Sequence, residues 1–159
     1  MTVIPEIRIQ AEDFNLDSEV SKLTKTSNDI GAVVTFSGLC RDEKGTLAAL
    51  ELEHYPGMAE AEIRKIAKEA IDRFNLTGMI AIHRYGKILP GENIVLVIAA
   101  SPHRHAAFDG ANFLMDFLKT NAPFWKKEHL KNGKEGKWVD ARDSDVKAAS
   151  RWEKTPSRP

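Results

Sequence analysis

Basic residues lie on both sides of one predicted helix, where they could hold an anionic ligand. His103-Arg104 follows directly after the apolar run at residues 94–100, and Lys119 and Lys126 come at the end of the next helical pattern and beyond it. Free N–H groups at a helix start attract anions, and arginine binds phosphate and carboxylate groups bidentately. A lysine withdrawn from water near other cations can act as a base or a nucleophile. This spacing favours a site for a small anion.

Each of these residues also has a simpler interpretation, and the sequence leaves both open. Arg41 follows a predicted strand and a glycine, which suits anion binding, but it also begins the charged run 41–44. His103 could cap the following helix, with Arg104 paired to a nearby acid. Lys119 would only interact with the helix dipole unless it lies in a pocket. The aromatic pair Phe124-Trp125 could wall a ring-shaped ligand or pack in the core.

Two other kinds of chemistry find less support. Cys40 could be a nucleophile or a persulfide carrier, but it has no histidine beside it in the sequence, so we expect a small buried apolar side chain. It is the single cysteine, which excludes an intramolecular disulfide. His103 and His105 lack a cysteine or helical carboxylate at ligand spacing, so we expect no metal site. The sequence contains no Walker A loop, nucleophile elbow or dinucleotide-binding glycine motif.

Composition narrows the class of protein. The chain has 159 residues, 42% of them hydrophobic, which suits one globular domain. It has no apolar run near the roughly 20 residues of a membrane span and no secretory signal at its start, so we expect a cytoplasmic protein. The net charge is zero, yet residues 119–137 hold six lysines against two glutamates. A small anion or an acidic partner surface fits this better than nucleic acid does.

Hydrophobic periodicity predicts the elements that must position these residues. We expect strands at 3–10, 30–36, 50–55, 79–85 and 93–100, and helices at 15–24, 59–74 and 104–119. The strand at 30–36 should be buried and end in a loop at 37–45. A hairpin should join 125–130 to 137–139, and Ser144 should cap a helix that reaches Trp152. Since strands and helices mix without strict alternation, we predict an α+β fold.

The helix at 104–119 has an unusual pattern. Its polar positions form one narrow stripe, while almost all other positions are apolar. Such a helix is buried on several sides. In a chain of this length, a second protomer could cover part of its surface.

Several motifs, each weak alone, are jointly specific. They are residues 31–38 (GAVVTFSG) leading to Arg41, 52–58 (LEHYPGM), 83–86 (HRYG), 90–92 (PGE), His103-Arg104, 115–120 (MDFLKT), 122–128 (APFWKKE), 138–142 (WVDAR) and 151–152 (RW). In this order they resemble the large, catalytic subunit family of molybdopterin synthase, the MoaE family, over roughly residues 4–152. The resemblance implies a single domain at 1–152 with a flexible tail at 153–159. Its fold would be a mixed or antiparallel sheet with packed helices, similar to an α/β hammerhead, plus a small C-terminal hairpin region.

The resemblance also implies an activity. The enzyme would be a sulfurtransferase of molybdenum cofactor biosynthesis, converting cyclic pyranopterin monophosphate to molybdopterin. It would need no cofactor, because a small ubiquitin-like subunit would deliver each sulfur as a thiocarboxylate on its C-terminal Gly-Gly tail. A homodimer of the large subunit would carry one such partner at each end, forming a heterotetramer. The alternative is a non-catalytic module that binds a phosphate ligand or a protein.

Site residues follow from the same resemblance. The substrate pocket would comprise Leu39, Cys40, Arg41, His103, Arg104, Lys119, Lys126, Lys127, Glu128 and, further, Arg142. Lys119 and Lys126 would be the catalytic residues, meeting the thiocarboxylate and assisting attack or proton transfer; the division of these roles stays open. Arg41, His103 and Arg104 would hold the phosphate and the pterin.

Two of these residues lie far apart on one predicted helix. Arg104 and Lys119 are fifteen residues apart on one predicted helix, about 22 Å at ~1.5 Å per residue. A pterin phosphate cannot bridge that distance. We therefore expect one active site to combine His103 and Arg104 of one protomer with Arg41, Lys119 and Lys126 of the other.

Overall fold

The structure is an α+β arrangement of two sheets and three helices over the residues it describes. The computed structural model describes residues 2–121, 124–139 and 152. In chain order the elements are β1 (Glu6–Gln10), α1 (Leu16–Thr24), β2 (Ala32–Leu39), β3 (Leu47–His54), α2 (Met58–Phe74), β4 (Gly78–Arg84), β5 (Gly86–Ile88), β6 (Asn93–Ser101), α3 (Arg104–Thr120) and β7 (Phe124–Leu130). The α+β prediction is confirmed.

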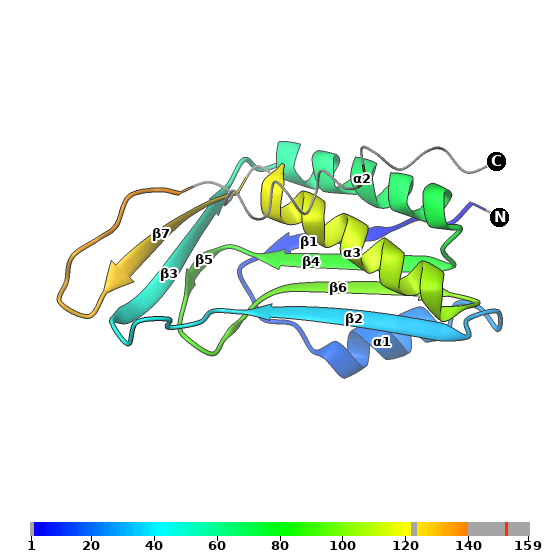
Figure 1. Ribbon diagram of the computed structural model, residues 1–159, viewed down its shortest axis with the longest axis horizontal. Helices are drawn as coiled ribbons and strands as arrows, with labels where there is room; N and C mark the ends of the chain where they lie inside the picture. Colours follow the sequence, from blue (N-terminus) through cyan, green and yellow to red (C-terminus); the bar gives the residue numbers. More distant parts are fainter. Residues whose placement is uncertain (1, 122–123, 140–151, 153–159) are drawn as a thin grey trace.

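A mixed four-stranded sheet forms the centre of the molecule, in the order β1-β4-β6-β2. β1 runs parallel to β4, and the other two pairs are antiparallel. Helices α2 and α3 cover one face of this sheet, and α1 lies on the other (Figure 1). Alternate residues of β6 serve the two faces: Val97 packs towards α2 and α3, whereas Leu96 packs towards α1.

The prediction that the strand at 30–36 is buried is wrong. β2 is an edge strand, paired only with β6, and most of its side chains are half-buried or exposed. Phe36 has 40% of its surface exposed. The strand also continues to Leu39, two residues into the segment expected to be a loop. A β-branched apolar run indicates a strand, but its burial depends on the order of strands in the sheet.

A second, three-stranded antiparallel sheet extends from one end of the first, in the order β5-β3-β7 (Figure 1). The expected hairpin after β7 is present, because His129 bridges to Glu135 and Lys126 bridges to Val139. The sequence did not predict the short β5. The expected helix from Ser144 to Trp152 falls almost entirely outside the described residues.

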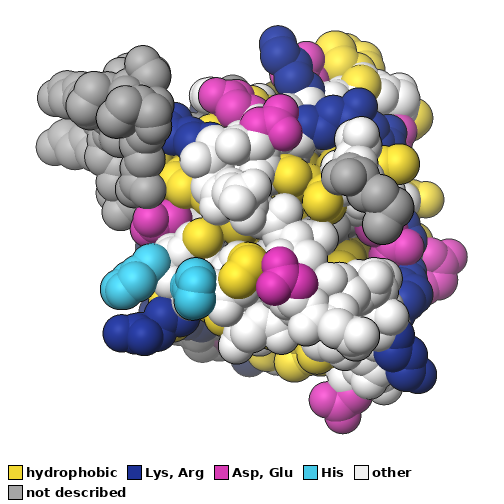
Figure 2. Space-filling model, turned by 90° about the vertical axis from the view of Figure 1, so that its right-hand side faces the viewer, with side chains coloured by type: hydrophobic (Ala, Val, Ile, Leu, Met, Phe, Trp, Pro, Cys, Tyr) yellow, Lys and Arg dark blue, Asp and Glu magenta, His cyan; other side chains and the backbone are white. Residues whose placement is uncertain are grey.

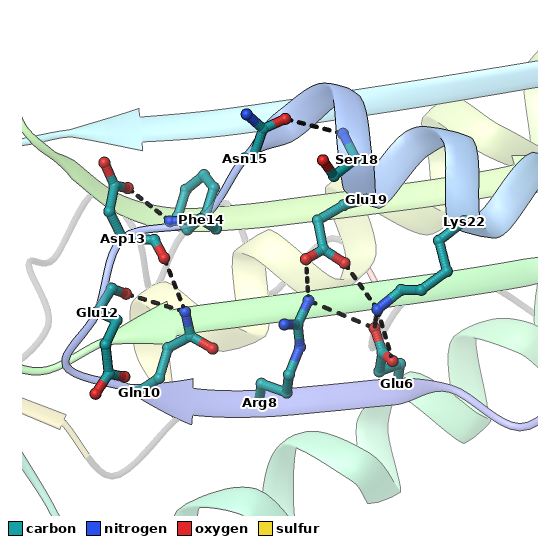
Figure 3. Close-up of polar contacts among 10 residues, drawn as sticks. All are labelled: Glu6, Arg8, Gln10, Glu12, Asp13, Phe14, Asn15, Ser18, Glu19 and Lys22. Carbon is teal, nitrogen blue, oxygen red and sulfur yellow. Dashed lines mark hydrogen bonds and ion pairs between the residues drawn. The ribbon is translucent and has the colours of Figure 1, made fainter.

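Charged side chains fasten α1 to β1 (Figure 3). Arg8 on β1 forms an ion pair with the buried Glu19 of α1, and the Lys22 ammonium lies 3.0 Å from a Glu6 carboxylate oxygen. The Asn15 side chain caps the helix by accepting a hydrogen bond from the backbone N–H of Ser18 at 2.9 Å.

Helix α3 is buried along most of its length, as its apolar pattern predicts. Its buried residues are Ala107, Gly110, Ala111, Phe113, Leu114, Met115, Phe117 and Leu118. Phe108 is the exception, with 55% of its surface exposed. A Cβ atom at Gly110 would lie 2.7 Å from Leu76 Cδ1, so glycine allows the close approach of that side chain. None of the helices in the described ranges is both long and apolar enough to cross a membrane.

Candidate active site

A cavity of about 580 Å³ opens where the three-stranded sheet meets the end of α3. Ligand pockets commonly have this size. Its lining includes Leu39 at the end of β2, Cys40 and Arg41 directly after it, Leu52 of β3, His83 of β4, Lys119 of α3, and Phe124, Lys126 and Glu128 of β7. Lys119 therefore lies in a pocket. This position meets the condition, stated from the sequence, for a binding role of Lys119 beyond an interaction with the helix dipole. The fold brings together most of the residues predicted for the substrate pocket.

The pairing of β3 with β7 explains why Lys126 faces this cavity. Lys126 lies opposite the buried Leu52 in the antiparallel register. Side chains alternate along a strand, so Phe124, Lys126 and Glu128 share one face. The half-buried position of Lys126 places a cation beside apolar surface.

Lys127 projects to the other face of β7. Its ammonium lies 3.3 Å from a Glu135 carboxylate oxygen and 4.8 Å from the centre of the Trp138 ring. It does not line the cavity. The structure thus separates two consecutive lysines that the sequence assigned to the same pocket.

Arg41 lies at the rim of the cavity. Its side chain is 75% exposed, and the guanidinium lies 3.2 Å from a Glu43 carboxylate oxygen. The neighbouring Asp42 accepts a hydrogen bond from the Leu47 backbone N–H at 3.1 Å, which fastens the loop to β3. Exposed ion pairs contribute little to stability. Arg41 can therefore leave Glu43 for an incoming anion at small cost.

Cys40 reaches the cavity wall but is not a reactive thiol in this state. Only 3% of its surface is exposed, and it packs with Leu47, Leu52 and Ile88. Burial, with the negative charges of Glu92, Asp42 and Glu128, raises the pKa of the Cys40 thiol, although a hydrogen bond with the Leu50 backbone opposes this. The thiolate is the nucleophile, so a raised pKa disfavours covalent chemistry.

His103 and Arg104 lie at the far end of α3 from this cavity. Both side chains are exposed, together with His105. Figure 2 looks onto that end of the molecule and shows histidine and basic side chains gathered at one edge. His103 occupies the N-cap position without a capping hydrogen bond from its side chain. Within one chain these residues do not reach Lys119.

His83 is a cavity residue to which the sequence analysis gave no role. Its Nδ1 lies 2.8 Å from the Arg84 carbonyl oxygen, and its ring stacks on Phe124 with centroids 3.8 Å apart. Burial, with the electrostatic effects of Lys119 and His54, lowers the pKa of His83 to about 4. The HRYG motif contained it, but a histidine in a buried strand gives no local signal of a pocket.

The remaining candidate residues and hollows do not add to this cavity. Arg142 lies outside the described residues. Within the described part of the chain, no three His, Cys, Asp or Glu side chains lie together as metal ligands would. A second hollow follows the solvent side of α2 and is lined by Arg64, Lys65, Lys68, Glu69 and Asp72. Those charges form an ordinary solvated helix face.

Comparison with known proteins identifies the family. The model of the family described as "MoaE protein" matches residues 9–121. The chain belongs to the MoaE family. The match includes β2, β4, β6 and α3, and with them most of the cavity and the whole His103-Arg104 end; β7 with Lys126 lies beyond it.

The similarity to individual relatives extends beyond the matched segment and covers nearly the whole chain. The chain is 64% identical over 148 residues to the molybdopterin synthase catalytic subunit of Mesorhizobium japonicum, covering 93% of each chain. It is 65% identical over 146 residues to the protein of the same name from Rhizobium meliloti, covering 92% of this chain and 94% of that one. A solved structure, the molybdopterin biosynthesis MoaE protein from Burkholderia ambifaria, superposes with a TM-score of 0.83 at 46% identity. The superposition covers 96% of this chain and 100% of the other.

Proposed function

We propose that this MoaE-family chain is the catalytic subunit of a molybdopterin synthase. It converts cyclic pyranopterin monophosphate to molybdopterin, as a sulfurtransferase that takes two sulfurs from a small thiocarboxylated carrier subunit. The observation that carries the proposal is the cavity lined by two lysines from different elements. Lys119 comes from α3, Lys126 comes from β7, and Arg41 lies at the rim. The names of its relatives agree with this activity. We expect it to act in the cytoplasm.

The two lysines suit a reaction with an anionic donor. A thiocarboxylate carries a negative charge, which the ammonium groups of Lys119 and Lys126 would attract and orient. In each transfer the thiocarboxylate sulfur would bond to a carbon of the substrate, and water would then cleave its bond to the acyl carbon, leaving a carboxylate on the carrier. A lysine that is deprotonated at that step can take up the proton released by the water. Glu128 on the same strand face supplies a carboxylate beside Lys126.

Arg41 suits the phosphate of the substrate. A guanidinium binds phosphate through two parallel hydrogen bonds, and the exposed pair with Glu43 is weak enough to be replaced. Leu39 and Cys40 would contact the pterin through their apolar surfaces. A substrate role for Lys127 requires that its pair with Glu135 opens, and a role for Arg142 rests on the family resemblance alone.

One active site would use residues of two protomers. His103 and Arg104 stand at the N-terminal end of α3, and Lys119 stands in its last turn. A single small ligand cannot touch both ends. In a homodimer, His103 and Arg104 of a second protomer would complete the site, and the carrier subunit would dock beside each site to form a heterotetramer. The exposed Phe108 on α3 is an apolar contact available for such assembly.

The direct test is conversion of the cyclic pyranopterin monophosphate by this protein with the thiocarboxylated carrier. We expect dithiolene formation by the wild type and loss of turnover, with binding retained, for Lys119→Ala. Binding of the substrate without conversion by the wild type would favour a non-catalytic binding module. Unchanged turnover in Lys119→Ala would remove the proposed role of that lysine.

A further inference from the structure

His83 occupies a position in the cavity that no role assigned so far explains. It lies on β4, in the interior of the four-stranded sheet, and its side chain reaches the cavity shared with Lys119 and Lys126. Polar side chains in such interior strands are costly unless they are hydrogen-bonded. An apolar residue would fit the surrounding core equally well, so packing alone does not explain an imidazole at this position.

The hydrogen bond to Arg84 determines which ring nitrogen carries the proton. The Arg84 carbonyl oxygen can only accept, so Nδ1 of His83 must donate across the 2.8 Å contact. In an uncharged imidazole the other nitrogen, Nε2, then has a lone pair and accepts hydrogen bonds. Among the described residues no hydrogen-bond partner meets Nε2. Nδ1 of the ring is therefore held as a donor to the backbone, and Nε2 is available as an acceptor for a group in the cavity.

The charge state of His83 agrees with this geometry. Burial is the largest cause that disfavours a positive charge on His83, the hydrogen bond with the Arg84 backbone opposes it, and Lys119 from α3 and His54 from β3 add to the effect of burial. Together with burial, they lower the pKa of His83 to about 4. The imidazole is therefore uncharged at neutral pH, and the ammonium of Lys119 lies near enough to the His83 ring to influence its protonation.

His83 also supports the start of β7. Its ring stacks on Phe124 at an interplanar angle of 15°, and Phe124 lies two residues before Lys126 on the same strand face. His54, opposite Phe124 in the register, has its ring centre 6.0 Å from that of Phe124. Because the stack fixes the first residue of β7, it also fixes the direction in which Lys126 enters the cavity.

We propose that His83 is a positioning residue for both cavity lysines. Its Nε2 lone pair accepts a hydrogen bond from the Lys119 ammonium when substrate and carrier tail are bound, and its stack on Phe124 orients Lys126. This inference rests on the proposed function for its kinetic effect, but the coupling between His83 and Lys119 is independent of it.

Two substitutions separate the two contributions. His83→Phe keeps a flat ring for the Phe124 stack and removes the acceptor, whereas His83→Gln keeps an acceptor near the position of Nε2 and removes the stack. We expect kcat of His83→Phe to fall by about tenfold to a hundredfold with KM changed by less than about threefold, because positioning errors act on the reacting geometry. His83→Gln should recover part of that loss. His129→Gln, on the opposite face of β7, is the matched control, and thermal melts verify folding of each variant.

A titration that needs no turnover tests the coupling directly. The Cε1–H resonance of His83, identified by its absence in His83→Gln, should titrate near pH 4 in the wild type. In Lys119→Met the midpoint should rise, whereas in Lys119→Arg, which keeps the charge, it should stay. A midpoint that does not respond to Lys119→Met, or a folded His83→Phe with wild-type kcat, would overturn the inference. A wild type without turnover would contradict the proposed function, and the titration would then decide on His83 alone.

Discussion

Arg104 and Lys119 lie on the same helix but at its opposite ends, so they face opposite ends of the molecule. Arg104 begins α3 and is exposed, and Lys119 lies in the last turn and lines the cavity. They are fifteen positions apart along the helix, which is about 22 Å at ~1.5 Å per residue. Each chain thus presents two separate clusters of basic residues, and the apolar surface of α3 lies between them.

Cys40 should be dispensable for turnover. Its thiol is buried and its pKa is raised by that burial, so it is a poor nucleophile at neutral pH. We expect Cys40→Ser to keep most of the activity, with some loss of stability because a hydroxyl replaces an apolar contact. The measurement is the rate of precursor conversion, corrected for folded protein by thermal melts. A folded but inactive Cys40→Ser would revive a persulfide role.

Lys126 and Lys127 should differ strongly in their effect on activity. Lys126 shares the cavity face with Phe124, whereas Lys127 is engaged with Glu135 on the other side of β7. We expect Lys126→Ala to lower kcat by at least about a hundredfold, a usual effect of losing a proton-transfer group, and Lys127→Ala to have a much smaller effect. Single-turnover rates of the two variants provide the comparison. Equal losses would show that β7 presents both lysines to the substrate.

The ion pairs of Glu19 should make stability depend on acidic pH. Burial opposes ionisation of Glu19, but hydrogen bonds and charges from Arg8 and Lys22 outweigh it, so its pKa is lowered from the usual 4.5. A lowered carboxyl pKa contributes stability above the unfolded value, and this is lost as pH falls through the folded value. Glu19→Gln should therefore cost about 1–3 kcal/mol at pH 7. The difference from wild type should shrink as pH falls from the usual carboxyl pKa of 4.5 through the lowered pKa of folded Glu19, because the side chain then becomes protonated in the folded protein.

Urea unfolding at pH 7 and at low pH checks this prediction. The exposed Glu12→Gln is a matched control from the same end of the chain and should leave the free energy of unfolding nearly unchanged. A Glu19→Gln penalty that is the same at both pH values would mean that packing, and not charge, fastens α1 to β1.

The sequence predicted elements well where the signal is local. The helices at α2 and α3 follow from apolar side chains repeating at helical spacing. The burial of β2 was mispredicted because it depends on strand order, which no local pattern contains. The three residues of β5 are too few to show a period.

The site was predictable only in part, for a similar reason. Arg41, Lys119 and Lys126 were expected from their residue types and from family motifs, and the fold brings them to one cavity. His83 was missed because its partners, Phe124 and Lys119, are brought to it only by the packing of α3 and β7 against the sheet. Lys127 was grouped with Lys126 because sequence adjacency does not show which strand face meets the cavity.

The most direct test of the account is complementation between Arg104→Ala and Lys119→Ala chains. Each variant alone should be inactive in precursor conversion, since each lacks one half of every site. If the site is shared, a mixed dimer contains one site with both defects and one intact site. Turnover of purified mixed dimers should therefore recover to about half of the wild-type value, because one of the two sites in each dimer is intact. Verified mixed dimers with no recovered turnover would contradict a shared active site.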